Sequence, residues 1–144
     1  MSVQKACFLW MLLGGTVLLA QQTPWKAPTE SSLTKIPVRY VYNEARARNL
    51  FQAQCSMCHG KSGKGDGPLS IAYKVADLAT PLVQAQTNGA LLWKIKQGRT
   101  PMPAFGHSLR EEELWDMVCL IRTFDSESSN HTFPPDSLTK NTQN

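Results

Sequence analysis

The chain has 144 residues, of which 42% are hydrophobic, and its 15 basic and 11 acidic side chains give a formal net charge of +4. This is enough material for one modest domain with a single core, and no internal repeat points to a second. The basic residues are scattered among apolar ones, without the dense clusters typical of phosphate binding, so the composition argues against a nucleic-acid-binding protein.

Residues 1–20 predict an export signal. Lys5 supplies a positive charge, and ACFLWMLLGGTVLLA (residues 6–20) is an uncharged, largely apolar run that ends on the small residue Ala20. Because this run is shorter than the roughly 20 residues of a spanning helix, cleavage is favoured over retention as a membrane anchor. We expect membrane attachment only if this segment is retained.

Two further segments are predicted to lie outside the folded domain. Residues 21–39 contain three prolines among Thr, Ser and Lys, a composition that favours a flexible linker. Residues 125–144 are polar, contain prolines and have no apolar periodicity, which predicts a disordered tail. The folded domain is therefore expected at residues 40–124.

The first half of this domain predicts two helices. Asn43 can cap the first one, which carries Ala47, Leu50 and Phe51 on one face and leads directly into Cys55. Pro68 can open a second, short helix. The residues expected on its inner side are Ile71, Ala72, Val75 and Ala76.

The second half predicts two more helices and no convincing strand, so the expected fold class is all-α. One helix starts at Asn88 and stops at Gly98, where a left-handed residue is needed. Its inner side would carry Leu91, Leu92 and Ile95. The last helix is expected to start with a capping box of Ser108 and Glu111. Its buried face would carry Leu114, Met117, Val118 and Ile121, and Cys119 is expected to be a buried, inert thiol.

Cys55-Ser56-Met57-Cys58-His59 matches the C-x-x-C-H pattern that attaches a c-type haem. On a helical turn, residues i and i+3 face the same way, so both thiols can reach one porphyrin edge while the imidazole binds the iron. A thioredoxin-like dithiol would need a βαβ setting, and zinc would need a second ligand pair at short spacing. A disulfide would leave His59 unexplained. The motif therefore indicates covalent haem.

Met102 is the predicted second axial ligand. It lies in Thr100-Pro101-Met102-Pro103, where the prolines keep the residue out of a helix and leave its thioether free to project from a loop. His107 is the rival ligand. Met117, inside the last helix, is interpreted as a packing residue.

The chain resembles the mono-haem class I c-type cytochromes of bacteria. The resemblance rests on CSMCHG, GKGDGP, ALLWKIKQGRTPMPAFG and LREEELWDMVCLIRTF, which lie between residues 43 and 124. It implies a small helical fold around one haem, with Cys55 and Cys58 carrying the thioethers and His59 and Met102 as axial ligands. It also implies that the carbonyl of Pro68 accepts a hydrogen bond from the other nitrogen of His59.

The expected function is one-electron transfer between exported redox partners, a respiratory oxidase or a dehydrogenase, in the bacterial periplasm. An iron with both axial positions filled has no open position for a substrate, so we expect a carrier, or a carrier subunit of a complex, and not an enzyme. The alternative is a haem-based sensor or peroxidase-like enzyme in which Met102 leaves the iron. As a hypothesis, lysines and an arginine ring the haem edge and orient an acidic partner protein, the alternative being that they are ordinary solvated side chains. These residues are Lys61, Lys64, Lys94, Lys96 and Arg99.

Overall fold

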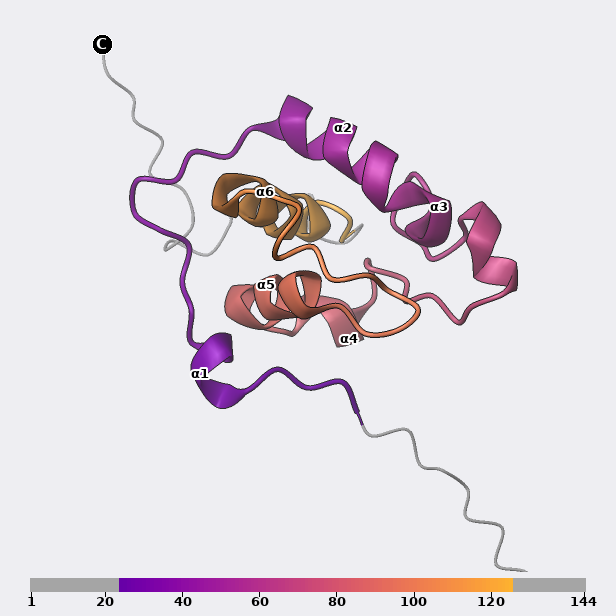
Figure 1. Cartoon of the computed structure of the whole chain (residues 1–144), viewed down its shortest axis with the longest axis horizontal. Coiled ribbons are helices and arrows are strands. Elements are labelled where there is room, and N and C mark those ends of the chain that lie inside the picture. Colours follow the sequence, from indigo (N-terminus) through magenta and orange to yellow (C-terminus); the bar gives the residue numbers. More distant parts are fainter. Residues whose placement is uncertain (1–23, 126–144) are drawn as a thin grey trace, which may run out of the picture.

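The computed structural model describes residues 24–125, and within that range the chain forms helices and turns without a strand, as the all-α prediction requires. The elements are α1 (Thr29–Ser32), α2 (Glu44–Gln54), α3 (Ser56–His59), the 3₁₀ turn η2 (Pro68–Ile71), α4 (Pro81–Gln84), α5 (Asn88–Gln97) and α6 (Glu111–Arg122) (Figure 1). The predicted export signal and all but the first residue of the predicted tail lie outside the described residues. No helix in the described range is long and apolar enough to cross a membrane.

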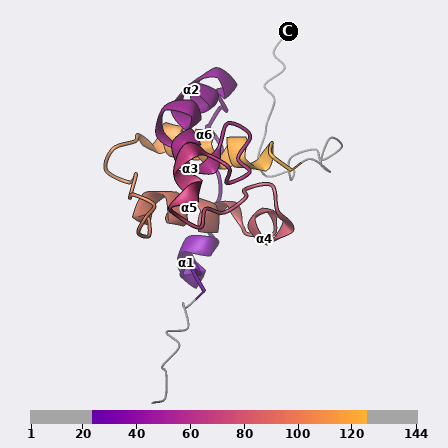
Figure 2. The ribbon, with the colours of Figure 1, turned by 90° about the vertical axis from the view of Figure 1, so that its right-hand side faces the viewer.

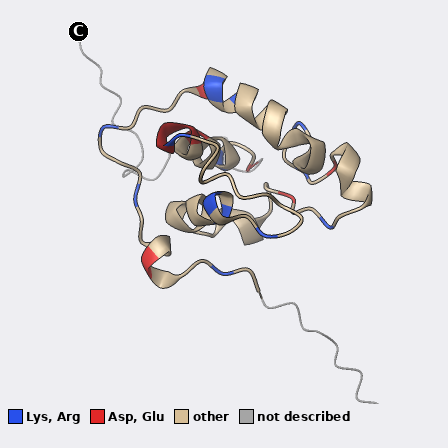
Figure 3. Cartoon of the chain, in the orientation of Figure 1, with Lys and Arg blue, Asp and Glu red and all other residues tan. Residues whose placement is uncertain are grey.

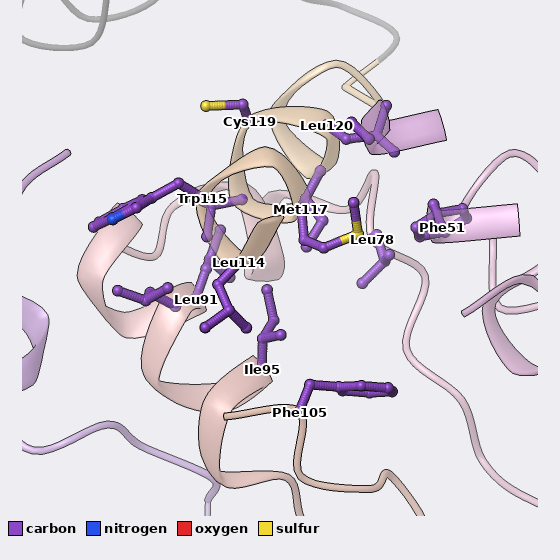
Figure 4. Close-up of a cluster of buried hydrophobic side chains, with 14 of the residues drawn as sticks. Phe51, Leu78, Leu91, Ile95, Phe105, Leu114, Trp115, Met117, Cys119 and Leu120 are labelled. Atoms are coloured by element: carbon purple, nitrogen blue, oxygen red, sulfur yellow. The ribbon is translucent and has the colours of Figure 1, made fainter. Parts of the chain in front are cut away.

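Helix α6 occupies the middle of the molecule. It lies between α2 on one side and α5 on the other, and α1 packs on the far side of α5 (Figures 1 and 2). All eight residues from Leu114 to Ile121 are buried, because α6 meets neighbours on more than one face. The four residues predicted for its inner face are confirmed as core. Figure 4 shows Leu114 and Met117 beside Leu91 and Ile95 of α5 and beside Leu78 of a neighbouring loop.

The first predicted helix is confirmed as α2. The side chain of Asn43 accepts a hydrogen bond from the backbone N–H of Arg46 (2.9 Å), which satisfies one of the unpaired donors at the start of a helix. Ala47 and Phe51 are buried against α6, whereas Leu50 is only partly buried. Since α2 ends at Gln54, its crossing with α6 fixes where Cys55 begins the next turn.

A buried carboxylate fastens the start of α2 to α6. Asp116 is fully buried and accepts hydrogen bonds from the Tyr40 hydroxyl (2.6 Å) and the Asn43 backbone N–H (3.1 Å). Its other oxygen pairs with the guanidinium of Arg46 (2.5 Å). A buried charge is tolerated only when it is paired and hydrogen-bonded in this way. Burial and this carboxylate raise the pKa of Tyr40, so its hydroxyl remains a donor.

The caps of α5 and α6 differ from the predicted ones by one or two residues. Helix α5 starts at Asn88 and stops before Gly98 as predicted, but Thr87 is the cap, its hydroxyl accepting from the N–H of Ala90 (3.1 Å). The predicted capping box of Ser108 and Glu111 is wrong. Arg110 has an extended backbone directly before the helix, so the carboxylate three residues later, that of Glu113, accepts from the Arg110 N–H (2.8 Å).

The second predicted helix does start at Pro68, but it is shorter than expected and its predicted inner side is wrong. From Pro68 the chain makes only the 3₁₀ turn η2, and Ile71, predicted to face the core, is 96% exposed. The chain instead turns back over the cysteine loop, where the N–H of Leu78 donates to the carbonyl of Gly63 (2.7 Å). This return places Leu78 in the core, and a continued helix would carry it away.

Parts of residues 24–39 contact the domain, although much of this segment is exposed and the sequence predicted a flexible linker. Helix α1 lies so close to α5 that a Cβ atom on Gly89 would stand 2.2 Å from the carbonyl oxygen of Ser31. The hydroxyl of Thr87 donates to the carbonyl of Ser32 (2.7 Å), and Ile36 is buried in the core. These contacts attach α1 and Ile36 to the domain.

Candidate functional site

The two cysteines and the histidine of the motif lie on consecutive turns after α2. The N–H of Cys55 donates to the last turn of α2 (2.8 Å, to Phe51), and the N–H groups of Cys58 and His59 both donate to the Cys55 carbonyl (3.1 and 2.9 Å). This geometry keeps the thiols three residues apart on a helical turn, with the imidazole immediately after them. Both cysteines are partly buried and neither forms a disulfide.

Gly60 ends this turn in a conformation that other residues avoid. Its φ is +74°, and a Cβ atom there would stand 1.8 Å from a carboxylate oxygen of Asp66. The loop that follows is closed by hydrogen bonds from Gly65 to the His59 carbonyl (2.8 Å) and from Gly67 to the Cys58 carbonyl (3.1 Å). The loop thus holds the backbone of both motif residues in place.

The imidazole of His59 is oriented by a backbone carbonyl. Its Nδ1 lies 3.1 Å from the carbonyl oxygen of Ala76, whereas the resemblance implied the carbonyl of Pro68 as the partner. Pro68 lies in η2, whereas the returning chain brings Ala76 to the histidine. With the proton on Nδ1, the lone pair of Nε2 is available to a metal. Burial lowers the pKa of His59, and the bond to Ala76 opposes this.

Met102 lies on a tight turn after α5. Its N–H and carbonyl pair with the carbonyl and N–H of Arg99 (2.8 and 2.9 Å). Gly98 makes this turn possible, because its φ of +62° and ψ of 171° suit glycine alone, and a Cβ atom would stand 2.5 Å from the backbone of Pro103. Met102 is therefore held outside a helix, as its flanking prolines predict.

Cys55, His59 and Met102 all line one cavity, although Met102 lies on a different segment from the two motif residues. The rest of the lining is mostly apolar and comes from residues 25 and 51, from the loop around Leu78, and from α4, α5 and α6. Its other members are Trp25, Phe51, Ala76, Leu78, Val83, Gln86, Leu91, Lys94, Ile95, Phe105, Leu109, Met117 and Ile121. Thiol, imidazole and thioether around an apolar space are the donor set and surroundings of a covalent haem.

The other residues that could bind a metal differ in their position relative to this cavity. His107 is exposed and does not line this cavity. Met117 does line it, from the buried face of α6, and Figure 4 shows its sulfur pointing toward Leu78 and Phe51. Cys119 is buried on another side of α6 and points away from these residues (Figure 4).

Two residues of the lining, Gln86 and Trp25, were not predicted, whereas Lys94 was expected among the basic residues at the haem edge. Lys94 lies on α5 beside the predicted inner residue Ile95, and a lysine at a half-buried helix position was a usable signal. Gln86 and Trp25 gave no such signal. Gln86 belongs to a turn, and Trp25 lies in the segment interpreted as a linker.

Comparisons with known proteins indicate the class of protein. Residues 43–121 match the family model described as cytochrome c oxidase, cbb3-type, subunit III. Over 75 residues the chain is 29% identical to cytochrome c6 of Alaria esculenta, covering 52% of this chain and 84% of that protein. The solved structure of the KustC0563 c-type cytochrome aligns with a TM-score of 0.50 and 25% identity, covering 54% of this chain and 95% of that one. The chain thus belongs to the family described as cytochrome c oxidase, cbb3-type, subunit III, and is a mono-haem class I c-type cytochrome with one covalently bound haem.

Proposed function

We propose that the protein carries single electrons on a haem that Cys55 and Cys58 hold through thioether bonds and that His59 and Met102 ligate axially. The observation that supports this assignment is the shared apolar cavity, which is lined by one thiol of the motif, the imidazole and the loop methionine. When bound, the haem iron supplies the one-electron change between its ferrous and ferric states.

The residues of the chain have three tasks in this proposal. His59 and Met102 would both bind the haem iron, which would leave no position for a substrate. The carbonyl of Ala76 orients the imidazole and increases its basicity. The apolar lining excludes water, and exclusion of water together with a thioether ligand favours the ferrous form.

The alternative, a sensor or peroxidase-like enzyme, has less support. Peroxidase chemistry needs an acid–base group opposite the proximal histidine. Within the described residues the cavity lining contains no carboxylate and no histidine besides His59. His107, the only nearby candidate in the sequence, is exposed outside the lining.

Two methionine variants test the axial assignment. In the oxidised wild type, sulfur-to-iron ligation should give a weak absorption band at the red end of the visible spectrum. We expect Met102→Leu to abolish this band and Met117→Leu to keep it, since both methionines line the cavity but only Met102 projects from a loop. Loss of the band in Met117→Leu alone would overturn the assignment. The reduced wild type should also resist binding of carbon monoxide.

The proposed location is the periplasm, with a respiratory oxidase as the electron acceptor, a choice supported by the description of the family. We also propose an acidic docking partner, with a revised set of basic residues. Lys94 lines the cavity and Lys96 pairs with Glu111 (3.3 Å), whereas Lys61 and Lys64 are exposed in the loop after the motif. Figure 3 shows the basic residues spread over several elements of the chain. Lys61 and Lys64 are the best candidates for steering.

Electron-transfer kinetics against an oxidase test the steering. We expect the second-order rate constant to fall as ionic strength rises, and Lys61→Gln with Lys64→Gln to weaken this dependence. Lys35→Gln is the control, because it changes an exposed lysine in the segment between α1 and α2, which lies away from α3 (Figure 1). A rate constant that is independent of salt, or an equal effect of both substitutions, contradicts steering.

A further inference from the structure

Lys94 is a cation in the wall of an otherwise mostly apolar cavity. It lies on α5, is partly buried, and is the only Lys or Arg among the described lining residues. Lys96, two residues later on the same helix, instead forms an exposed ion pair with Glu111. The two lysines therefore have different surroundings, although they are close in the sequence.

The recorded partners of the Lys94 ammonium group are neutral. It donates a hydrogen bond to the side-chain oxygen of Gln86 and lies 5.2 Å from the centre of the Trp25 ring. An aromatic face attracts a cation but does not neutralise its charge. Burial, and secondarily the positive charge of Arg99, lower the pKa of Lys94. Among the described residues that line the cavity there is no carboxylate.

Trp25 reaches this position because the N-terminal segment packs on α5. The close approach of α1 to Gly89 and the bond from Thr87 to Ser32 fix that segment. Trp25 lies outside residues 43–121, which match the family model. The corner formed by Trp25, Gln86 and Lys94, here called the Lys94 corner, thus combines the family domain with a segment of this chain beyond the match.

A haem carries two propionate carboxylates at one edge, and a carboxylate in a partly buried site requires a charged or hydrogen-bonding partner. We infer that the Lys94 corner is a carboxylate-binding subsite that receives a haem propionate, with Lys94 as the charged donor and Gln86 as a second polar contact. Trp25 covers the ammonium group and keeps it from bulk water. This inference rests on the covalent haem and does not require Met102 to be the axial ligand.

The test uses the haem-loaded protein and compares Lys94→Gln with Lys96→Gln, both of which remove one lysine charge from α5. A cation close to the haem favours the reduced state, since reduction lowers the positive charge of the iron site. At a fixed applied potential, we expect Lys94→Gln to lower the ratio of reduced to oxidised protein about tenfold. Lys96→Gln should leave this ratio nearly unchanged, and Lys94→Arg should restore most of it.

A second measurement identifies the carboxylate itself. With carbon-13 in the propionate carboxyl groups, the infrared carboxylate bands should shift in Lys94→Gln and not in Lys96→Gln. Equal ratios and equal spectra for these two variants would overturn the inference. If Lys94→Gln loses its haem, the inference is tested with Lys94→Arg. Arginine keeps the positive charge, so the inference predicts that this variant retains the carboxylate bands of the wild type. A wild type without covalent haem would instead overturn the proposed function.

Discussion

The buried carboxylate of Asp116 gives the sharpest test of how this small helical domain is held together. Asp116→Asn keeps the shape of the side chain but removes its charge and replaces one acceptor oxygen with a donor. The substituted amide can still accept from Tyr40 and Asn43, because both of them donate to the same oxygen. The guanidinium of Arg46 then loses its partner.

The expected loss in the free energy of unfolding follows from these contacts. Removing one partner of a buried ion pair costs about 3–5 kcal/mol. The side chain of Arg46 is 30% exposed, so water recovers part of its hydration and we expect about 2–3 kcal/mol. For a domain of this size that corresponds to a decrease in Tm of roughly 10–20 °C.

Thermal and guanidinium unfolding of the haem-loaded protein measure this loss. The matched control is Glu44→Gln, an identical chemical change in an exposed pair with Arg48, in which both side chains are about 60% exposed. It should cost less than about 1 kcal/mol. Equal losses for both variants would refute the reasoning that burial makes Asp116 important.

Three further predictions concern other contacts of the fold. Gly98→Ala should destabilise the Met102 turn by about 1–3 kcal/mol, measured as a lower denaturant midpoint for loss of the red-end band, because φ at Gly98 is +62°; an unchanged midpoint contradicts this. Gly89→Ala should lower the free energy of unfolding by about 1–3 kcal/mol, since its Cβ atom would meet the Ser31 carbonyl; no loss would show that α1 yields without cost. Cys119 is 1% exposed, and burial raises the pKa of its thiol to about 11. At pH 8 the thiol should therefore be alkylated at least tenfold more slowly in the folded protein than in denaturant, and equal rates would refute its burial.

Local patterns of the sequence predicted the elements that carry the site. Apolar spacing identified the buried faces of α5 and α6, and the glycine at 98 marked the end of α5. The motif and the proline-flanked methionine pointed to residues that share the cavity. These signals depend on neighbours within a few residues, so one sequence is sufficient to find them.

Contacts between distant segments were not predictable in this way. Ala76 is the partner of His59 because the chain returns after η2, and nothing in its local sequence distinguishes this carbonyl from that of Pro68. The pairing of Asp116 with residues about 70 positions earlier depends on how α2 crosses α6. The proline content of residues 21–39 favoured a linker. It carries no information about the surface of α5 on which α1 packs, so this contact was not predictable.

The covalent haem is the central claim, and the mass of the denatured protein tests it most directly. Protein treated with acid and organic solvent should retain its colour and weigh one haem more than its polypeptide, whereas Cys55→Ser with Cys58→Ser should lose both properties. Release of the colour into the solvent from the wild type, with a polypeptide of unmodified mass, would contradict the account.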